Sequence, residues 1–153
     1  MKTRANTSSF VYVTYIRTTP DKLWRALTTP DFMQRYFFGM AIVPNPSWKK
    51  GATWTLGPTG ETPYDAGTVV EVKPRKRIVL RWHHEADAKL KAEGDARCVM
   101  TLEPVGKTVK LTITHTMNRP HSKLIDAVAG GWPQILSNLK SLLETGKIVL
   151  KEF

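Results

Sequence analysis

Residues 131–146, GWPQILSNLKSLLETG, contain the most regular hydrophobic pattern in the chain. Apolar side chains recur there at the three-, four- and seven-residue intervals that place them on one face of an α-helix. The members of this stripe are Trp132, Ile135, Leu136, Leu139, Leu142 and Leu143. Gly146 follows at the position where glycine commonly ends a helix. The pattern predicts an amphipathic C-terminal helix with one face for packing against a sheet.

The start of this helix is less regular. Leu124 and Val128 continue the apolar stripe upstream. Pro133 lacks a backbone N–H, and its ring clashes with the carbonyl four residues earlier. Together with the glycine at Gly130, this predicts a break near Gly130 and a main helix starting around Trp132.

The chain before residue 120 is rich in β-strand patterns. Alternating or β-branched runs predict strands at 10–17, 52–56, 67–73, 77–84, 96–103 and 108–117. Short breaks at 74–76 and 104–107 favour antiparallel hairpins. The Thr-Pro-Asp sequences at 19–21 and 29–31 predict two short helices, because Thr caps a helix and Pro suits its first position.

The order of these elements predicts an α+β fold with a curved antiparallel sheet covered by one long helix. We assign residues 10–146 to a single domain, with residues 1–9 as a frayed N-terminus and 147–153 as a C-terminal tail. If the helix does not fill the curved sheet, a cavity remains between them.

Composition limits the classes of function. The chain has 153 residues, 41% of them hydrophobic, and a net charge of +10, which favours acidic partners without naming one. A single cysteine excludes an internal disulfide and a multi-cysteine zinc site. No apolar run reaches the ~20 residues of a membrane helix, and no apolar leader is visible at the N-terminus. We therefore expect a cytoplasmic protein.

Three segments together resemble one known family. These are residues 131–146, Leu111-Thr112-Ile113-Thr114-His115, and residues 16–28 with the sequence IRTTPDKLWRALT. They resemble the C-terminal helix, the last strand and the first strand and helix of proteins similar to the activator of heat-shock-protein-90 ATPase, in the START-like or SRPBCC superfamily. The resemblance implies a helix-grip fold, with a seven-stranded antiparallel sheet and an internal apolar cavity. Members of the superfamily bind lipids, hormones or polyketides, and some are cyclases or hydrolases.

The chain has more aromatic residues than a core of this size needs. They either pack together or line a ligand cavity, and Trp82 and Trp132 are the strongest candidates for the cavity. The full candidate set for the cavity is Trp24, Tyr36, Phe37, Trp54, Leu80, Trp82, His84, Met100, Ile113, His115, Trp132 and Leu136.

Histidines are the main candidates for chemistry. His83 and His84 are adjacent on a strand, so their side chains face opposite ways and do not form a metal site together. His84 and His115 share strand faces with apolar residues and are expected to point inward, either as structural residues or as an acid–base group. Tyr12, Thr14 and Thr68 are the other polar residues that could point inward.

No motif for catalysis or cofactor binding is present. The chain lacks a Gly-x-Ser-x-Gly elbow and a phosphate-binding Gly-x-x-x-x-Gly-Lys loop. Cys98 alternates with apolar residues and is expected to be a buried, inert thiol. We therefore assign no catalytic residue, no metal and no cofactor.

Basic residues cluster at one predicted turn: Lys73, Arg75, Lys76 and Arg77. They either keep a turn solvated or bind a chaperone or another acidic protein. No aromatic residue is interleaved with them, which argues against a platform for stacking single-stranded nucleic acid. We expect no specific nucleic-acid partner. The charged segment 85–95 forms a loop, one helical turn, or a lid over a pocket.

Three functions follow from these observations. The first is binding of a small apolar or amphipathic ligand in the cavity. The second is a chaperone-associated interaction module that uses the basic residues. The third is a polyketide cyclase- or hydrolase-like enzyme with a cavity histidine.

Overall fold

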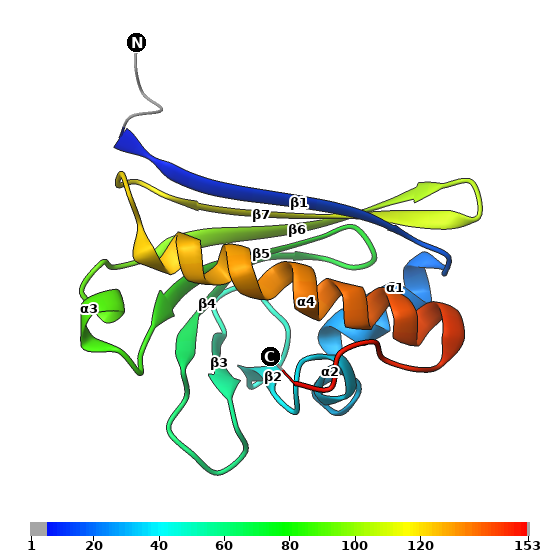
Figure 1. Ribbon diagram of the computed structural model, residues 1–153, viewed down its shortest axis with the longest axis horizontal. Helices are drawn as coiled ribbons and strands as arrows, with labels where there is room; N and C mark the ends of the chain where they lie inside the picture. The colour runs from blue at the N-terminus through cyan, green and yellow to red at the C-terminus, as the bar shows by residue number, and fades with distance from the viewer. Residues whose placement is uncertain (1–5, 153) are drawn as a thin grey trace.

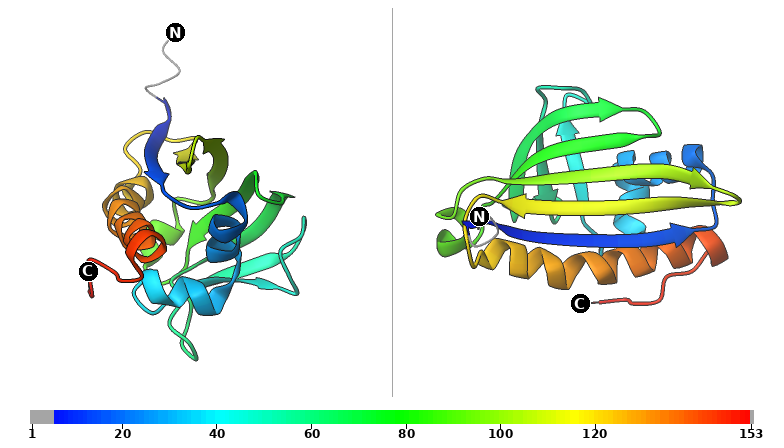
Figure 2. Two further views of the ribbon diagram at one scale, coloured as in Figure 1. Left: turned by 90° about the vertical axis from the view of Figure 1, so that its right-hand side faces the viewer. Right: turned by 90° about the horizontal axis from the view of Figure 1, so that it is seen from above.

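The computed structural model describes residues 6–152, in which a long helix lies along the concave face of a seven-stranded antiparallel sheet (Figures 1 and 2). The elements in chain order are β1 (Ser8–Ile16), α1 (Pro20–Thr28), α2 (Pro30–Tyr36), β2 (Ala41–Asn45), β3 (Thr53–Gly57), β4 (Asp65–Lys73), β5 (Arg77–His84), α3 (Ala88–Lys91), β6 (Ala96–Val105), β7 (Thr108–Met117) and α4 (Lys123–Thr145). The strand order is β1-β7-β6-β5-β4-β3-β2. The expected helix-grip fold is confirmed.

Alternation along the strands explains the single apolar face of the sheet. In β7, every second residue from Val109 to Met117 is buried, and the residues between them are half-exposed. The expected hairpins β4–β5 and β6–β7 are confirmed, because residues 74–76 and 106–107 connect antiparallel neighbours. Residues 104 and 105, expected in the second break, belong to β6. The buried face of the sheet is thus the face toward α4.

Two elements differ from expectation at the edges of the sheet. The sequence pattern missed β2, a five-residue strand that contains Pro44; proline is tolerated there because β2 is an edge strand. β1 begins at Ser8, inside the segment expected to fray. Ser8 Oγ donates to the carbonyl of Arg119 (2.7 Å) and accepts from the N–H of Ser122 (3.0 Å). Residues 1–5 of that segment lie outside the described residues.

The predicted break in the C-terminal helix is wrong. α4 is continuous from Lys123 to Thr145 and passes through Gly130 and Pro133. An interior proline costs about 3 kcal/mol, but each fully buried large apolar side chain contributes roughly 1.5–3 kcal/mol. Buried Leu124 and Trp132 lie on either side of Gly130, so packing holds both halves of the helix in line.

The first turn of α4 is capped from two directions. Ser122 Oγ accepts from the N–H of Ile125 (3.1 Å). The Glu93 carboxylate accepts from the N–H of Lys123 (2.9 Å) and of Leu124 (3.2 Å). A carboxylate at this end is favoured by the unpaired N–H groups of the helix. The loop before β6 therefore anchors the start of α4.

The residues after α4 pack back against it. Buried Asn138 accepts with its Oδ1 from the N–H of Val149 (3.0 Å) and of Leu150 (2.7 Å). Its Nδ2 donates to the carbonyl of Leu150 (2.7 Å). This one side chain thus fixes the path of the C-terminal segment.

Gly67 permits a close crossing of side chain and backbone in the sheet. The indole N–H of Trp54 on β3 reaches over β4 and donates to the carbonyl of Arg81 on β5 (3.1 Å). A Cβ on Gly67 would lie 1.8 Å from that carbonyl oxygen and 2.9 Å from the Trp54 nitrogen. Only glycine leaves room for this contact.

We predict that Gly67→Ala lowers the free energy of unfolding by about 3 kcal/mol or more, because overpacking against backbone atoms cannot relax easily. Gly130→Ala is the matched control: Gly130 lies in α4, and a Cβ there would meet nothing within 4 Å. It should raise stability by roughly 0.5–1 kcal/mol. Urea unfolding of both variants tests this; equal stabilities would contradict the crossing described for Trp54.

Candidate functional site

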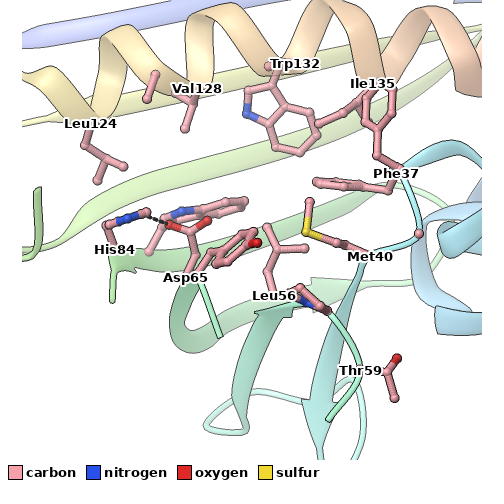
Figure 3. A pocket seen from close by; sticks show the side chains of 17 residues that line it. Phe37, Met40, Leu56, Thr59, Asp65, His84, Leu124, Val128, Trp132 and Ile135 are labelled. Carbon is pink, nitrogen blue, oxygen red and sulfur yellow. Dashed lines mark hydrogen bonds and ion pairs between the residues drawn. The ribbon is translucent and has the colours of Figure 1, made fainter. Parts of the chain in front are cut away.

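Trp132 projects from the middle of α4 toward the sheet (Figure 3). Its indole N–H donates to Nδ1 of His115 on β7 (3.3 Å). Its ring centroid lies 6.1 Å from that of Phe37 and 6.0 Å from that of Trp82. These contacts connect α4 to β5, to β7 and to the end of α2.

A cavity of about 630 Å³ lies beside Trp132, between the N-terminal half of α4, the loop after α2 and strands β3–β5. Its volume is within the usual range for small-molecule sites. The lining residues are Phe37, Phe38, Gly39, Met40, Leu56, Pro58, Thr59, Tyr64, Asp65, Trp82, His84, Leu124, Ala127, Val128, Gly131, Trp132 and Ile135. Most of these side chains are apolar, and α4 contributes only apolar ones.

Asp65 and His84 form a hydrogen-bonded pair in the cavity wall (Figure 3). Nδ1 of His84 lies 2.8 Å from Oδ1 of Asp65; because a carboxylate only accepts, Nδ1 carries the proton. The two side chains are 16% and 14% exposed. Burial raises the pKa of Asp65, while His84 acts in the opposite direction. In the neutral imidazole Nε2 holds the lone pair, and no hydrogen bond within residues 6–152 engages it.

A β-bulge creates this pair. Val70 is an extra residue in β4 that shifts the pairing with β5 by one position. Asp65 therefore lies opposite His84, whereas an unbulged hairpin would place Ala66 there. The same shift turns Thr68 to the outer face of the sheet, so its expected inward orientation is wrong.

His115 is fully buried behind the cavity. Burial lowers its pKa to about 4, so the ring is neutral at pH 7. Nδ1 accepts from Trp132, which leaves the proton on Nε2. Nε2 has no hydrogen-bond partner within the described residues, and the ring lies 4.9 Å from that of Trp82. His115 supports the aromatic cluster and does not line the cavity.

Comparison with known proteins identifies the family. The model of the Activator of Hsp90 ATPase homolog 1-like protein family matches residues 17–144. The chain belongs to this family. No curated protein matches its sequence.

Solved structures of the same fold come from several organisms. Protein MLL2253 from Mesorhizobium loti has a TM-score of 0.75 at 22% identity, covering 92% of this chain and 100% of the other. The Aha1 dimer from Colwellia psychrerythraea has a TM-score of 0.71 at 20% identity, with coverages of 92% and 98%. PFC0360w, an HSP90 activator from Plasmodium falciparum, has a TM-score of 0.71 at 19% identity, with coverages of 89% and 96%. At these low sequence identities, the structural similarity shows a shared fold only.

In this member of the Hsp90-activator-like family, the candidate residues divide into two groups. Four of them line the cavity: Phe37, Trp82, His84 and Trp132. Seven are buried in the core without lining it: Tyr36, Trp54, Leu80, Met100, Ile113, His115 and Leu136. Trp24 on α1 is half-buried and also lies away from the cavity.

Several lining residues were not among the candidates. Asp65 depends on the bulge in β4, which no sequence signal marks. Phe38 and Met40 lie in a loop after α2, where strand or helix periods give no orientation. Leu124 and Val128 could have been found, because they continue the apolar stripe of α4 that contains Trp132.

The basic residues lie around the β4–β5 turn, away from the cavity. Three of them have acidic neighbours: Lys73 lies 3.4 Å and Arg77 3.8 Å from Glu71, and Arg75 lies 3.5 Å from Asp21. All these side chains are at least partly exposed, so the pairs contribute little to stability. They do reduce the positive charge that an acidic partner would meet.

Residues 85–95 include α3 and contribute no side chain to the cavity. The segment is attached at both ends. The N–H of Glu85 donates to the carbonyl of Tyr64 (2.6 Å), and Glu93 caps α4. Burial acts to raise the pKa of Glu93, but hydrogen bonds from Ser122 and the α4 backbone outweigh it and lower the pKa.

The two adjacent histidines diverge as expected. His83 contacts Glu85 and Asp95, while His84 contacts Asp65. Within residues 6–152, no group of three or more His, Cys, Asp or Glu side chains could hold a metal ion.

Cys98 is buried, which raises the pKa of its thiol. Among the helices described, none has the length and apolar character to cross a membrane.

We predict that the free energy of unfolding falls as the pH is lowered, because His115 is buried as a neutral ring. Its pKa is about 4 in the folded state and 6.5 when unperturbed, so the unfolded chain binds the proton first. The contribution of the neutral His115 ring to stability is present above about pH 6.5 and is lost as the pH falls toward 4. Between pH 7 and 5 the loss should be about 2 kcal/mol.

His115→Gln is the control, because glutamine offers an acceptor to Trp132 but does not titrate. Urea unfolding at pH 7 and pH 5 should show the extra loss in the unsubstituted protein only. The same pH dependence in both proteins would contradict the neutral, buried state of His115.

Proposed function

We propose that the protein binds a small apolar or amphipathic molecule in the cavity between α4 and β3–β5. The observation that carries this proposal is a space of about 630 Å³ between α4 and the sheet, lined mostly by apolar side chains. Folding normally fills a hydrophobic interior, so a space of this size, walled by apolar groups, is what a ligand site requires.

The distribution of polar groups supports an amphipathic ligand. Leu124, Val128 and Trp132 on α4 provide an apolar wall (Figure 3). Asp65 and His84 lie on the facing strands and provide hydrogen-bonding groups. A ligand with an apolar body and one polar group would match both walls.

The rim of the cavity offers a path of entry. Gly39, Thr59 and Ala127 are exposed lining residues, and Tyr64 is 43% exposed. These positions belong to the loop after α2, the β3–β4 connection and α4. A small molecule could therefore enter between loops without separation of α4 from the sheet.

Binding of the neutral dye N-phenyl-1-naphthylamine tests the proposal, because its fluorescence rises in apolar sites and it carries no charge to attract the basic surface. We predict saturable binding that Val128→Trp weakens at least tenfold by filling the cavity. Val11→Trp is the control, since Val11 is 56% exposed on β1. Equal binding by both variants, or no binding by the unsubstituted protein, would contradict the proposal.

The other two functions have less support. An interaction with a chaperone through Lys73, Arg75, Lys76 and Arg77 rests on the family and on the charge of +10; the acidic neighbours of three of these residues weaken it. An enzymatic role rests on His84, because it is the histidine that meets the cavity. A cytoplasmic location also remains a proposal.

A further inference from the structure

A row of residues on the convex face of the sheet carries only hydroxyl and guanidinium groups. The row crosses six strands in register, each residue directly opposite the next, and consists of Thr53, Thr68, Arg81, Arg97, Thr116 and Ser9. All six residues are exposed or half-exposed, and α4 lies on the opposite, concave face (Figure 2). Within residues 6–152, none of their side chains forms a hydrogen bond to another group of the protein.

Arg81 and Arg97 are neighbours at the centre of this row. Their Cα atoms are direct partners across β5 and β6. Like charges in directly opposite positions of antiparallel strands destabilise a sheet. Among the described residues Arg97 forms no ion pair, while Nε of Arg81 lies 3.9 Å from Oδ2 of Asp95. Asp95 is also shared with His83, whose Nδ1 lies 3.4 Å from Asp95 Oδ1. The arginine pair therefore keeps an excess of positive charge.

The two arginines line the same hollow on this face. It has a volume of about 230 Å³, and its wall includes Arg81, Arg97, Thr116, Asn118 and the carboxylate of Asp95. The hydroxyl of Thr116 and the amide of Asn118 add hydrogen-bond donors beside the guanidinium groups. The volume is below the range of sites for drug-sized molecules, so the hollow suits a small ion or one group of a larger ligand. Two guanidinium groups against one carboxylate favour an anion.

We propose that this hollow binds a phosphate group. A guanidinium donates two parallel hydrogen bonds to a phosphate, a geometry that matches its planar fork. A phosphate monoester carries about −1.5 to −2 charges at pH 7, so it can offset the repulsion between Arg81 and Arg97. A carboxylate has a single charge and two oxygens, which serve one guanidinium fork but not two. The site is separate from the cavity, because Arg81 and Trp82 are adjacent on β5 and face opposite sides of the sheet.

The phosphate could be the free ion or part of a small phosphorylated molecule. A second hollow, of about 430 Å³, shares Arg81 and Asp95 with the first and is lined further along by Thr53, Thr55 and Thr68. Its hydroxyl groups could hydrogen-bond the polar remainder of a phosphate ester. The shared chemistry of both sources is the phosphate group between the two arginines.

Titration of the ¹⁵N-labelled protein with sodium phosphate at pH 7.5 and constant ionic strength tests the proposal through backbone amide chemical shifts. We expect saturable shifts centred on Arg81, Arg97 and Thr116. Arg97→Gln should weaken binding about tenfold, because it removes charge-assisted hydrogen bonds. Arg25→Gln is the matched control, since it removes the same charge from an exposed position on α1, and its affinity should stay within about twofold.

Two further variants distinguish a shaped site from a general attraction of anions. Arg97→Lys keeps the charge but lacks the planar fork, so it should still weaken binding about threefold. Asp95→Asn removes the carboxylate from the wall of the hollow and should tighten binding about threefold. Unchanged affinity in both variants would contradict the proposed geometry.

Glucose 6-phosphate distinguishes the two sources of phosphate. Tighter binding than inorganic phosphate, with added shifts at Thr53 and Thr68, would support the site and identify a phosphorylated small molecule as its ligand. Equal affinity without those shifts would support the site and identify the free ion. The absence of saturable shifts, shifts confined to residues 73–77, or equal affinity of Arg97→Gln and the unsubstituted protein would overturn the proposal. None of these outcomes bears on ligand binding in the cavity, which the dye experiment tests.

Discussion

The position of Trp132 between helix and sheet is the constraint on which the site depends. Its indole bridges α4 to β5 and β7 through Trp82 and His115, and it meets Phe37 from the end of α2. The caps at Ser122 and Gly146 fix the two ends of α4. Trp132 thus connects the middle of α4 to the sheet, and the cavity lies beside the N-terminal half of the helix.

The periodicity of apolar side chains explains why the fold was more predictable than the site. Side chains return to the same face every 2 residues in a strand and every 3.6 residues in a helix. The spacing of apolar residues therefore predicted the buried faces of β7 and α4. Burial does not distinguish a packed core from a cavity wall. Met100 and Ile113 are buried on the same face of the sheet as Trp82, yet they do not line the cavity.

The polar pair in the cavity wall, Asp65 and His84, could be predicted from the sequence only in part. His84 was expected to face inward, but its partner Asp65 was not identified. The reason is one bulged residue, Val70, which changes which side of β4 faces the core between residues 65 and 69. Such a bulge depends on strand pairing across the sheet, and no local pattern announces it. The continuity of α4 through Pro133 is a second case, in which tertiary packing overrides a local preference.

The most direct test of a ligand site beside Trp132 is to locate a bound molecule by nuclear Overhauser effects in methyl-labelled protein. With N-phenyl-1-naphthylamine bound, the account predicts contacts from the dye to the methyl groups of Leu124 and Val128. Contacts confined to exposed Val11 and Val13 on β1, or none at saturating dye, would contradict it.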